Sequence, residues 1–186
     1  MDVAPKDRFQ SCIAHMMGTL GEIINDANLR GYRGVDGEIL KKVQSYIDQY
    51  DAHQLIISYI QYSYQFWAQM ADRDENFFLA NCGAIFGFLP IDKSDQAFFT
   101  QVISNLISAR DGNGNSYITD DDKDYLWDSF ATLNRISVNF MIADSTLIRE
   151  IDMLMNIQRM KEENESGTKI PRVTIDIQAA QKIWLS

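Results

Sequence analysis

The chain has 186 residues, 46% of them hydrophobic and 23% charged, a composition typical of one globular domain that excludes a mainly disordered chain. Its 17 Lys and Arg against 26 Asp and Glu leave a formal charge of -9, which disfavours contact with a phosphate backbone, so no nucleic-acid partner is expected. Acids and bases precede any apolar run at the N-terminus, and no apolar stretch is long enough to span a bilayer. We therefore expect a soluble intracellular (cytoplasmic) protein with no membrane span.

Apolar residues at helical spacing predict two helices in the first fifty residues. One stripe runs from Phe9 to Ile24, and a shorter one runs from Ile39 to Tyr50. Three glycines between positions 31 and 37 predict a turn that separates these helices. Cys12 and Cys82 both fall at apolar helical positions, which favours two reduced core thiols over a disulfide.

Aromatic and aliphatic residues nearly surround a third predicted helix over 52–70. Such a helix is usually central in a domain, although its tyrosines also suit a partner-binding face. A fourth helix is expected over 73–86, ended by Gly87 and Pro90, and a fifth from Ser94 or Asp95 to Ile107. These elements predict an all-α domain.

Oxygen-bearing side chains recur over 111–122 at a spacing that resembles the calcium loop of an EF-hand. Asp111, Asn113 and Asn115 occupy loop positions one, three and five. The carbonyl of Tyr117 suits position seven, and Asp122 stands at position twelve. The loop departs from the motif because position six is not glycine and position twelve is not glutamate. Calcium is the one cofactor that this resemblance implies, and no other cofactor is expected.

The same acids also have a purely structural explanation. Thr119 and Asp122 form a capping-box pattern at the start of a sixth helix, and Asp120, Asp121 and Asp124 suit the positive end of its dipole. The sequence offers no second loop with which an EF-hand could pair. Both the calcium and the capping interpretations stay open at this stage.

A seventh helix is predicted over 145–163. Its expected inward face carries Leu147, Ile151, Leu154, Ile157 and Met160, with Met153 and Met155 beside it. Methionines in such a stripe more often fill gaps in a core than bind a target. This helix completes a helical domain over 1–165.

Residues 166–186 are expected to form an extended C-terminal arm. Apolar and polar residues alternate over 169–178 as in a strand, and Pro171 rules out a continuous helix. The arm either packs on its own domain or reaches a neighbour, and since an all-helical domain offers few sheet edges, we expect it to dock on another protein chain. The predicted partner-binding residues are Pro171, Val173, Ile175, Ile177, Ile183, Trp184 and Leu185.

No residue pattern typical of catalysis occurs in the sequence. The histidines are His15 and His53, and there is no zinc-protease, di-iron, nucleophile-elbow or Walker pattern. Cysteines at helix-interior apolar positions favour inert thiols over nucleophiles. We therefore expect a protein that is not an enzyme.

Short stretches in the middle of the chain stand out: Gln61-Tyr-Ser-Tyr-Gln-Phe-Trp67, Asn76-Phe-Phe78 with Asn81, and Asp124-Tyr-Leu-Trp127 followed by Arg135-Ile-Ser137. They resemble stretches in uncharacterised acidic, mostly helical proteins of large nucleocytoplasmic DNA viruses, over about residues 40–145. The resemblance implies a non-enzymatic minor component of a virus particle, such as a minor capsid protein.

Taken together, the sequence predicts an all-α bundle of about six or seven helices with an extended C-terminal arm. Its expected role is that of a structural or interaction protein whose partners are other protein chains in an assembly. The alternative is an EF-hand-like calcium-binding module with the ion at 111–122.

Overall fold

The computed structural model describes residues 2–34 and 37–186, and this part of the chain is all-α, as predicted. Its α-helices are α1 (Pro5–Leu29), α2 (Glu38–Gln49), α3 (Ala52–Ser63), α4 (Trp67–Ala71), α5 (Glu75–Ile85), α6 (Lys93–Ser108), α7 (Asp120–Ala143), α8 (Thr146–Ser166) and α9 (Ile177–Trp184). Two short 3₁₀ helices join them, η1 (Tyr64–Phe66) and η2 (Phe86–Phe88). Within these ranges the only β-type pairing is an isolated bridge between Arg110 and Ser116.

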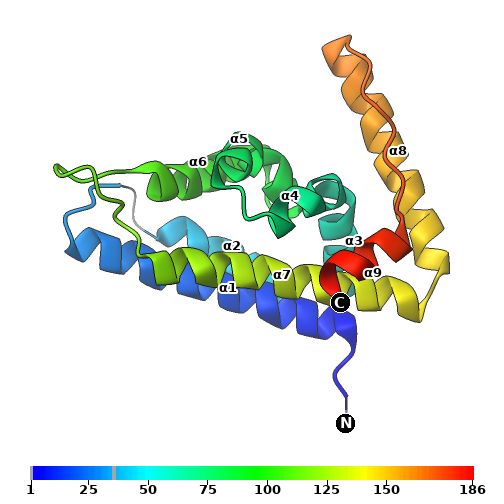
Figure 1. The fold of residues 1–186 in the computed structure, drawn as a ribbon, viewed down its shortest axis with the longest axis horizontal. Coiled ribbons are helices and arrows are strands. Elements are labelled where there is room, and N and C mark those ends of the chain that lie inside the picture. Colours follow the sequence, from blue (N-terminus) through cyan, green and yellow to red (C-terminus); the bar gives the residue numbers. More distant parts are fainter. Residues whose placement is uncertain (1, 35–36) are drawn as a thin grey trace.

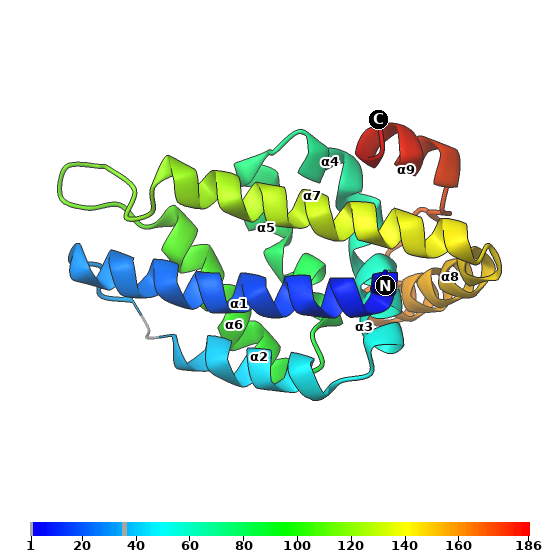
Figure 2. The same cartoon turned by 90° about the horizontal axis from the view of Figure 1, so that it is seen from below.

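The two longest helices, α1 and α7, lie antiparallel and side by side along one face of the molecule (Figures 1 and 2). Helix α2 lies along α1, while α3, α5 and α6 cover the inner side of the pair. The largest buried side chains between these layers are Phe9, Tyr59, Trp67, Phe86 and Phe99. Nowhere in the described ranges does a helix combine the length and apolarity needed to cross a bilayer.

Side-chain caps fix the starts of several helices, because a carboxylate or hydroxyl accepts a hydrogen bond from an otherwise unpaired backbone N–H. Asp51, Asp74 and Asp92 cap α3, α5 and α6 in this way. Helix α6 therefore begins before the predicted start at Ser94 or Asp95. Of the predicted glycine turn, residues 35 and 36 lie outside the described part, and Gly31 adopts φ +101° just after α1.

The helix predicted over 52–70 is broken by η1, and this prediction was wrong in that respect. The Ser63 hydroxyl donates to the Tyr59 carbonyl at 2.6 Å and accepts a hydrogen bond from Trp67 Nε1 at 2.9 Å. A serine that binds the carbonyl oxygen four residues earlier bends a helix, and here it also holds the indole ring inward. The break turns Trp67 into the core, where it is 2% exposed.

The tyrosine-rich helix lies in the core, as the favoured interpretation predicted. Tyr59 is fully buried, and its hydroxyl donates to Asn134 Oδ1 of α7 at 2.6 Å. Burial raises the pKa of Tyr59 far above the ordinary value, so the phenol stays protonated and acts as a donor. This buried hydrogen bond joins α3 to α7.

Candidate interaction surface

Helix α8 projects away from the rest of the molecule (Figure 1). Its first turn is fixed by Asp144, whose carboxylate accepts hydrogen bonds from the Thr146 hydroxyl at 2.6 Å and from the Thr146 N–H at 3.1 Å. These hydrogen bonds lower the pKa of Asp144. The helix ends at Gly167, whose φ of +69° permits its N–H to bind the Glu163 carbonyl at 2.8 Å.

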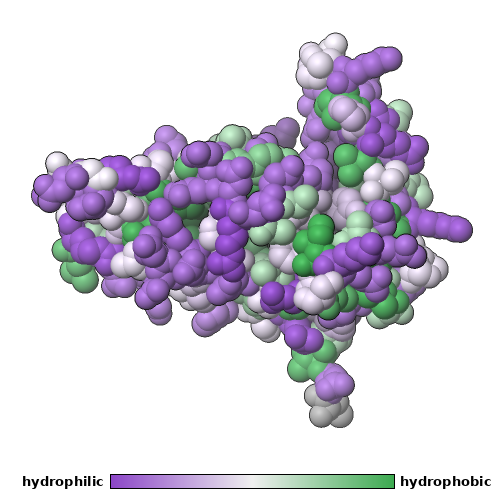
Figure 3. Space-filling view, viewed as in Figure 1, coloured by the Kyte–Doolittle hydropathy of each residue, from purple (hydrophilic) through white to green (hydrophobic). Residues whose placement is uncertain are grey.

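Helix α8 has two apolar faces. Leu147, Ile151 and Met155 are buried against the body. On the opposite side, an apolar stripe faces solvent and consists of Met153, Ile157 and Met160, which are 60%, 56% and 50% exposed. In the space-filling view, hydrophobic residues also appear between hydrophilic ones on the projecting part (Figure 3).

This arrangement corrects the prediction for α8, which placed Ile157 and Met160 inward. The predicted face takes every third residue from Ile151 to Met160. Because an α-helix turns by about 100° per residue, each step of three residues falls about 60° short of a full turn. The end of the predicted face therefore points to solvent, and Met155 is buried instead. The sequence thus identified Ile157 and Met160 as part of an apolar face, but the prediction placed that face on the buried side of the helix.

The returning chain lies along α8 over residues 167–176, without secondary structure (Figure 1). Side chains of α8 bind its backbone: Glu163 Oε1 accepts from the Ile170 N–H at 2.7 Å, and Asp152 Oδ1 accepts from the Ile175 N–H at 2.7 Å. The Arg159 guanidinium donates to the Ile170 carbonyl at 3.3 Å. Three backbone groups of this strand-like segment are thus bound by α8 side chains rather than by a sheet edge.

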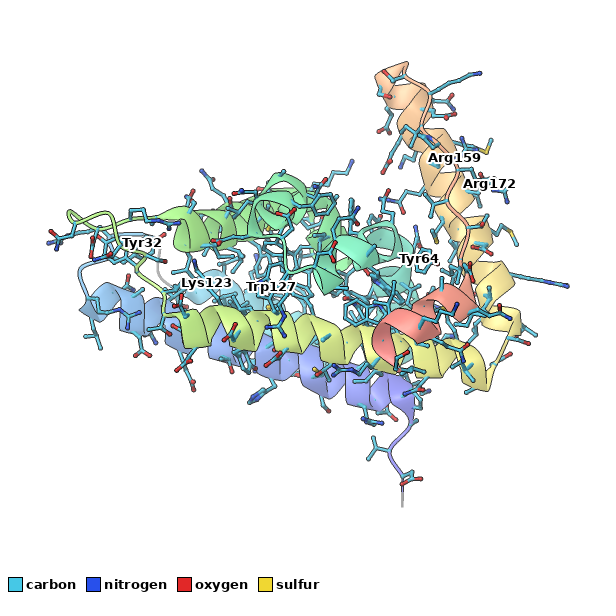
Figure 4. The ribbon with its side chains drawn as sticks, viewed as in Figure 1. Tyr32, Tyr64, Lys123, Trp127, Arg159 and Arg172 are labelled. Carbon is cyan, nitrogen blue, oxygen red and sulfur yellow. The ribbon has the colours of Figure 1, made fainter. Side chains whose placement is uncertain are left out.

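A polar crevice of about 410 Å³ lies between α3, α8 and the returning chain. Gln61 Nε2 donates to Gln158 Oε1 across it at 2.9 Å, joining α3 to α8. Arg159 on α8 and Arg172 on the returning chain also line it, and both are labelled in Figure 4. Arg159 binds Asn156 and Glu163 on its own helix, and it reaches the returning chain through the Ile170 carbonyl.

The last part of the arm forms helix α9, where the sequence predicted an extended segment. The Asp176 side chain caps it by accepting from the Ala179 N–H at 3.1 Å, and Tyr64 Oη accepts from the Asp176 N–H at 2.8 Å. Burial raises the pKa of Tyr64, so its hydroxyl stays neutral beside this cap. The Arg135 side chain then donates to the Trp184 carbonyl at 3.2 Å at the other end of α9.

The predicted partner-binding residues of the arm divide into two groups. Trp184 is 7% exposed and packs inside this chain, while Ile175 and Ile177 are half-buried against the same core. Pro171, Val173, Ile183 and Leu185 are exposed. The arm was expected to dock on another chain with Trp184 as its anchor. This prediction was wrong for Trp184, which is buried in its own domain.

The loop predicted to bind calcium connects α6 to α7. Asp111 Oδ1 accepts from the N–H groups of Asn113 at 2.8 Å and Asn115 at 2.9 Å, which closes the turn at Gly114. Asp122 completes the predicted capping box: its carboxylate accepts from the Thr119 N–H at 3.2 Å, and the Thr119 hydroxyl accepts from the Asp122 N–H at 3.1 Å. Both acids thus have structural roles.

The Tyr117 carbonyl, the predicted ligand at position seven, accepts hydrogen bonds from the Arg30 guanidinium, one of them from Nε at 3.1 Å. Tyr117 also packs against Tyr32, with ring centroids 5.4 Å apart, and Tyr32 is labelled beside the loop in Figure 4. A guanidinium at this carbonyl opposes a second cation there. In residues 2–34 and 37–186, no group of three or more His, Cys, Asp or Glu side chains is arranged to hold a metal ion.

An apolar cavity lies between α1, α5, α6 and α7 and contains about 440 Å³ of empty space, part of it open to solvent. Phe78, Trp127 and Phe130 line it, and Figure 4 shows Trp127 and Lys123 extending from α7. At its edge, Lys123 Nζ lies 3.3 Å from Oε1 and 3.4 Å from Oε2 of Glu75. The two charges pair with each other, and the other side chains that line the cavity are apolar.

The free thiols are buried or half-buried, and each histidine ring lies beside one aromatic ring. Burial raises the pKa of the free Cys12 thiol and raises that of the free Cys82 thiol to about 12, which suppresses the reactive thiolate. The His15 ring lies against Tyr125 and the His53 ring against Phe140. Comparisons with protein-family models, curated proteins and solved structures gave no match. The exposed stripe on α8 is therefore the candidate site with the clearest physical basis.

Proposed function

We propose that this chain is a non-enzymatic structural protein that binds other protein chains of an assembly through the exposed stripe on α8. The observation that supports the proposal is the exposure of Met153, Ile157 and Met160 on one face of a projecting helix. Exposed apolar side chains that gather on one face typically mark a protein interaction site, and covering them would release the water that they order.

The way in which α8 is held also supports this proposal. Its opposite face is buried by Leu147, Ile151 and Met155, and hydrogen bonds from Glu163 and Asp152 fasten the returning chain to it. A helix fixed in this way presents its outer face without a large ordering cost on binding. The narrower proposal, a minor component of a virus particle, depends on the sequence resemblance alone.

The experiment is site-specific photo-crosslinking in the full chain. A photoreactive amino acid at Ile157 should give adducts with other protein chains in the cells in which the protein is made naturally. The matched control is the same substitution at Glu22, an exposed residue of α1. Equal adduct yields at both positions, or none at Ile157, would contradict the proposed function.

The alternative function, a calcium-binding module, is less well supported. Its basis is the helix–loop–helix context of Asp111 to Asp122 between α6 and α7. However, Asp111 and Asp122 are engaged by backbone N–H groups, and Arg30 occupies the Tyr117 carbonyl. An ion would have to share these oxygens with the N–H groups and the guanidinium.

A further inference from the structure

We infer that the partner of the α8 stripe is the same stripe on a second copy of this chain, with the two α8 helices antiparallel. The inference rests on the proposed function, since it names the partner of the same surface. It depends on two properties of α8: where the stripe lies along the helix, and which charges flank it.

The stripe lies at the centre of its helix. Met153 comes seven residues after the first residue of α8, and Met160 six residues before the last. An antiparallel pair that sets Met153 against Met160 of the second copy therefore overlaps along nearly the whole of both helices. Ile157 then lies close to the two-fold axis, as a self-complementary interface requires.

Two oppositely charged residues flank the stripe on the same edge. At about 100° per residue, Glu150 and Lys161 lie about 60° and 80° round the helix from Met153. Both side chains are exposed, and neither has an ion-pair partner within the described part of the chain. They are about 16 Å apart along their own helix, too far to bind each other.

The antiparallel register supplies the missing partners. It brings Glu150 of one copy opposite Lys161 of the other, to within about 3 Å along the axis, and the two-fold axis repeats the pair. Two ion pairs thus border three apolar contacts, the arrangement by which charged edge residues fix the orientation of paired helices. The opposed helix dipoles also favour this orientation.

A parallel pairing fits the same face less well. It would place Lys161 beside Glu163 of the second copy, whose carboxylate already binds Arg159 and the Ile170 N–H. It would also align the two helix dipoles. The antiparallel pair instead joins Glu150 to Lys161, and neither has an ion-pair partner within the described part of the chain.

The first test is analytical ultracentrifugation of the full chain from about 1 to about 100 µM at about 0.15 M salt, where charges more than about 8 Å apart are screened. The wild type should pass from monomer to dimer. Ile157→Lys should raise the dissociation constant at least about tenfold. Leu29→Lys, at an 86% exposed residue far along α1, is the matched control and should dimerise normally.

The second test uses charge-reversal variants to determine whether the two α8 helices pair antiparallel. Glu150→Lys and Lys161→Glu should each raise the dissociation constant, because each sets like charges together in a homodimer. An equimolar mixture of the two variants should form a heterodimer. In that pair the two lysines on the edge of the first variant face the two glutamates on the edge of the second, so both ion pairs are restored with their signs exchanged at one of them.

In a parallel pair, mixing the two variants would not restore these ion pairs. A mixture of the two variants that stays monomeric would therefore overturn the antiparallel arrangement. A monomeric wild type over the whole concentration range, with circular dichroism that shows a folded chain, would overturn self-pairing altogether. The proposed function would survive that result if Ile157 still crosslinked to other proteins. It would fail if the crosslinker at Ile157 gave no adducts, or no more than the control at Glu22.

Discussion

The indole rings of Trp184 and Trp67 meet edge to face, with their centroids 6.5 Å apart and their planes at 87°. Such aromatic pairs stabilise a fold by more than the burial of their apolar surface alone. Trp67 belongs to the helix that follows the 3₁₀ break, and Trp184 belongs to the C-terminal helix, so the contact closes the chain end onto the core. The arm is consequently part of the domain and stabilises it.

Trp184→Ala is expected to lower the free energy of unfolding by about 3 kcal/mol, because it removes a large buried side chain. Urea denaturation followed by circular dichroism measures the loss. Leu185→Ala is the matched control, since Leu185 is the next residue but exposed, and should change stability by less than about 0.5 kcal/mol. Equal effects of the two substitutions would mean that the arm does not contribute to the core.

Thr119→Ala is expected to lower the free energy of unfolding by about 1 kcal/mol, because it removes the hydroxyl that caps α7. Thr132→Ala provides the control: Thr132 lies inside α7, where its hydroxyl binds the Asp128 carbonyl, and alanine is the better helix former. Thermal unfolding compares the two. A Thr119 variant as stable as the Thr132 variant would show that the capping box adds nothing.

Calcium at about 1 mM is expected to leave the melting temperature unchanged, because weak EF-hand sites bind near that concentration and this loop commits its oxygens elsewhere. Differential scanning fluorimetry with magnesium as the control ion measures the shift. A rise specific to calcium that disappears in Asp111→Ala would reverse this expectation and restore the calcium-binding function.

Stability at alkaline pH is expected to depend on Cys82. Its thiol loses its proton near pH 9.0 in the unfolded chain, whereas burial raises the pKa to about 12 in the folded chain. Between these values the unfolded state binds fewer protons, so stability falls as pH rises, by at most about 1.4 kcal/mol per pH unit.

Urea titrations between about pH 8 and pH 10 measure this dependence. Cys82→Ala should be less stable overall, because a cavity remains, but its stability should fall less steeply with pH than that of the wild type. Other groups, such as Tyr59, titrate in both proteins, so the difference between the two slopes is the relevant quantity. Parallel slopes would show that Cys82 is not shielded from ionisation.

Local signals in the sequence predicted what local interactions determine. The capping box of Thr119 and Asp122 involves residues three apart, and the stripe from Phe9 to Ile24 follows one helical period, so both are visible without a tertiary structure. Helix α9 also had such a signal, an aspartate cap at Asp176 followed by alanines and glutamines, but the alternating residues before it favoured an extended interpretation.

Tertiary contacts decided the features that were predicted wrongly. The break at Tyr64 depends on the Ser63 hydroxyl binding both a carbonyl and the Trp67 ring, which requires Trp67 to turn inward. Likewise, nothing in the spacing of Ile157 and Met160 states which face of α8 the body covers. The buried face of α8 is determined by its contacts with α3 and α7, and a periodic pattern does not contain the positions of those helices.

Tyr59→Phe is expected to lower the free energy of unfolding by about 1–3 kcal/mol, because it leaves Asn134 Oδ1 buried without its donor. Both residues are fully buried, so water does not replace the lost hydrogen bond. Asn134→Leu should likewise strand the Tyr59 hydroxyl. The double variant, which removes both polar groups, should be more stable than the sum of the single losses predicts, by about 0.5–3 kcal/mol. Additive losses in urea denaturation would show that the two groups do not interact.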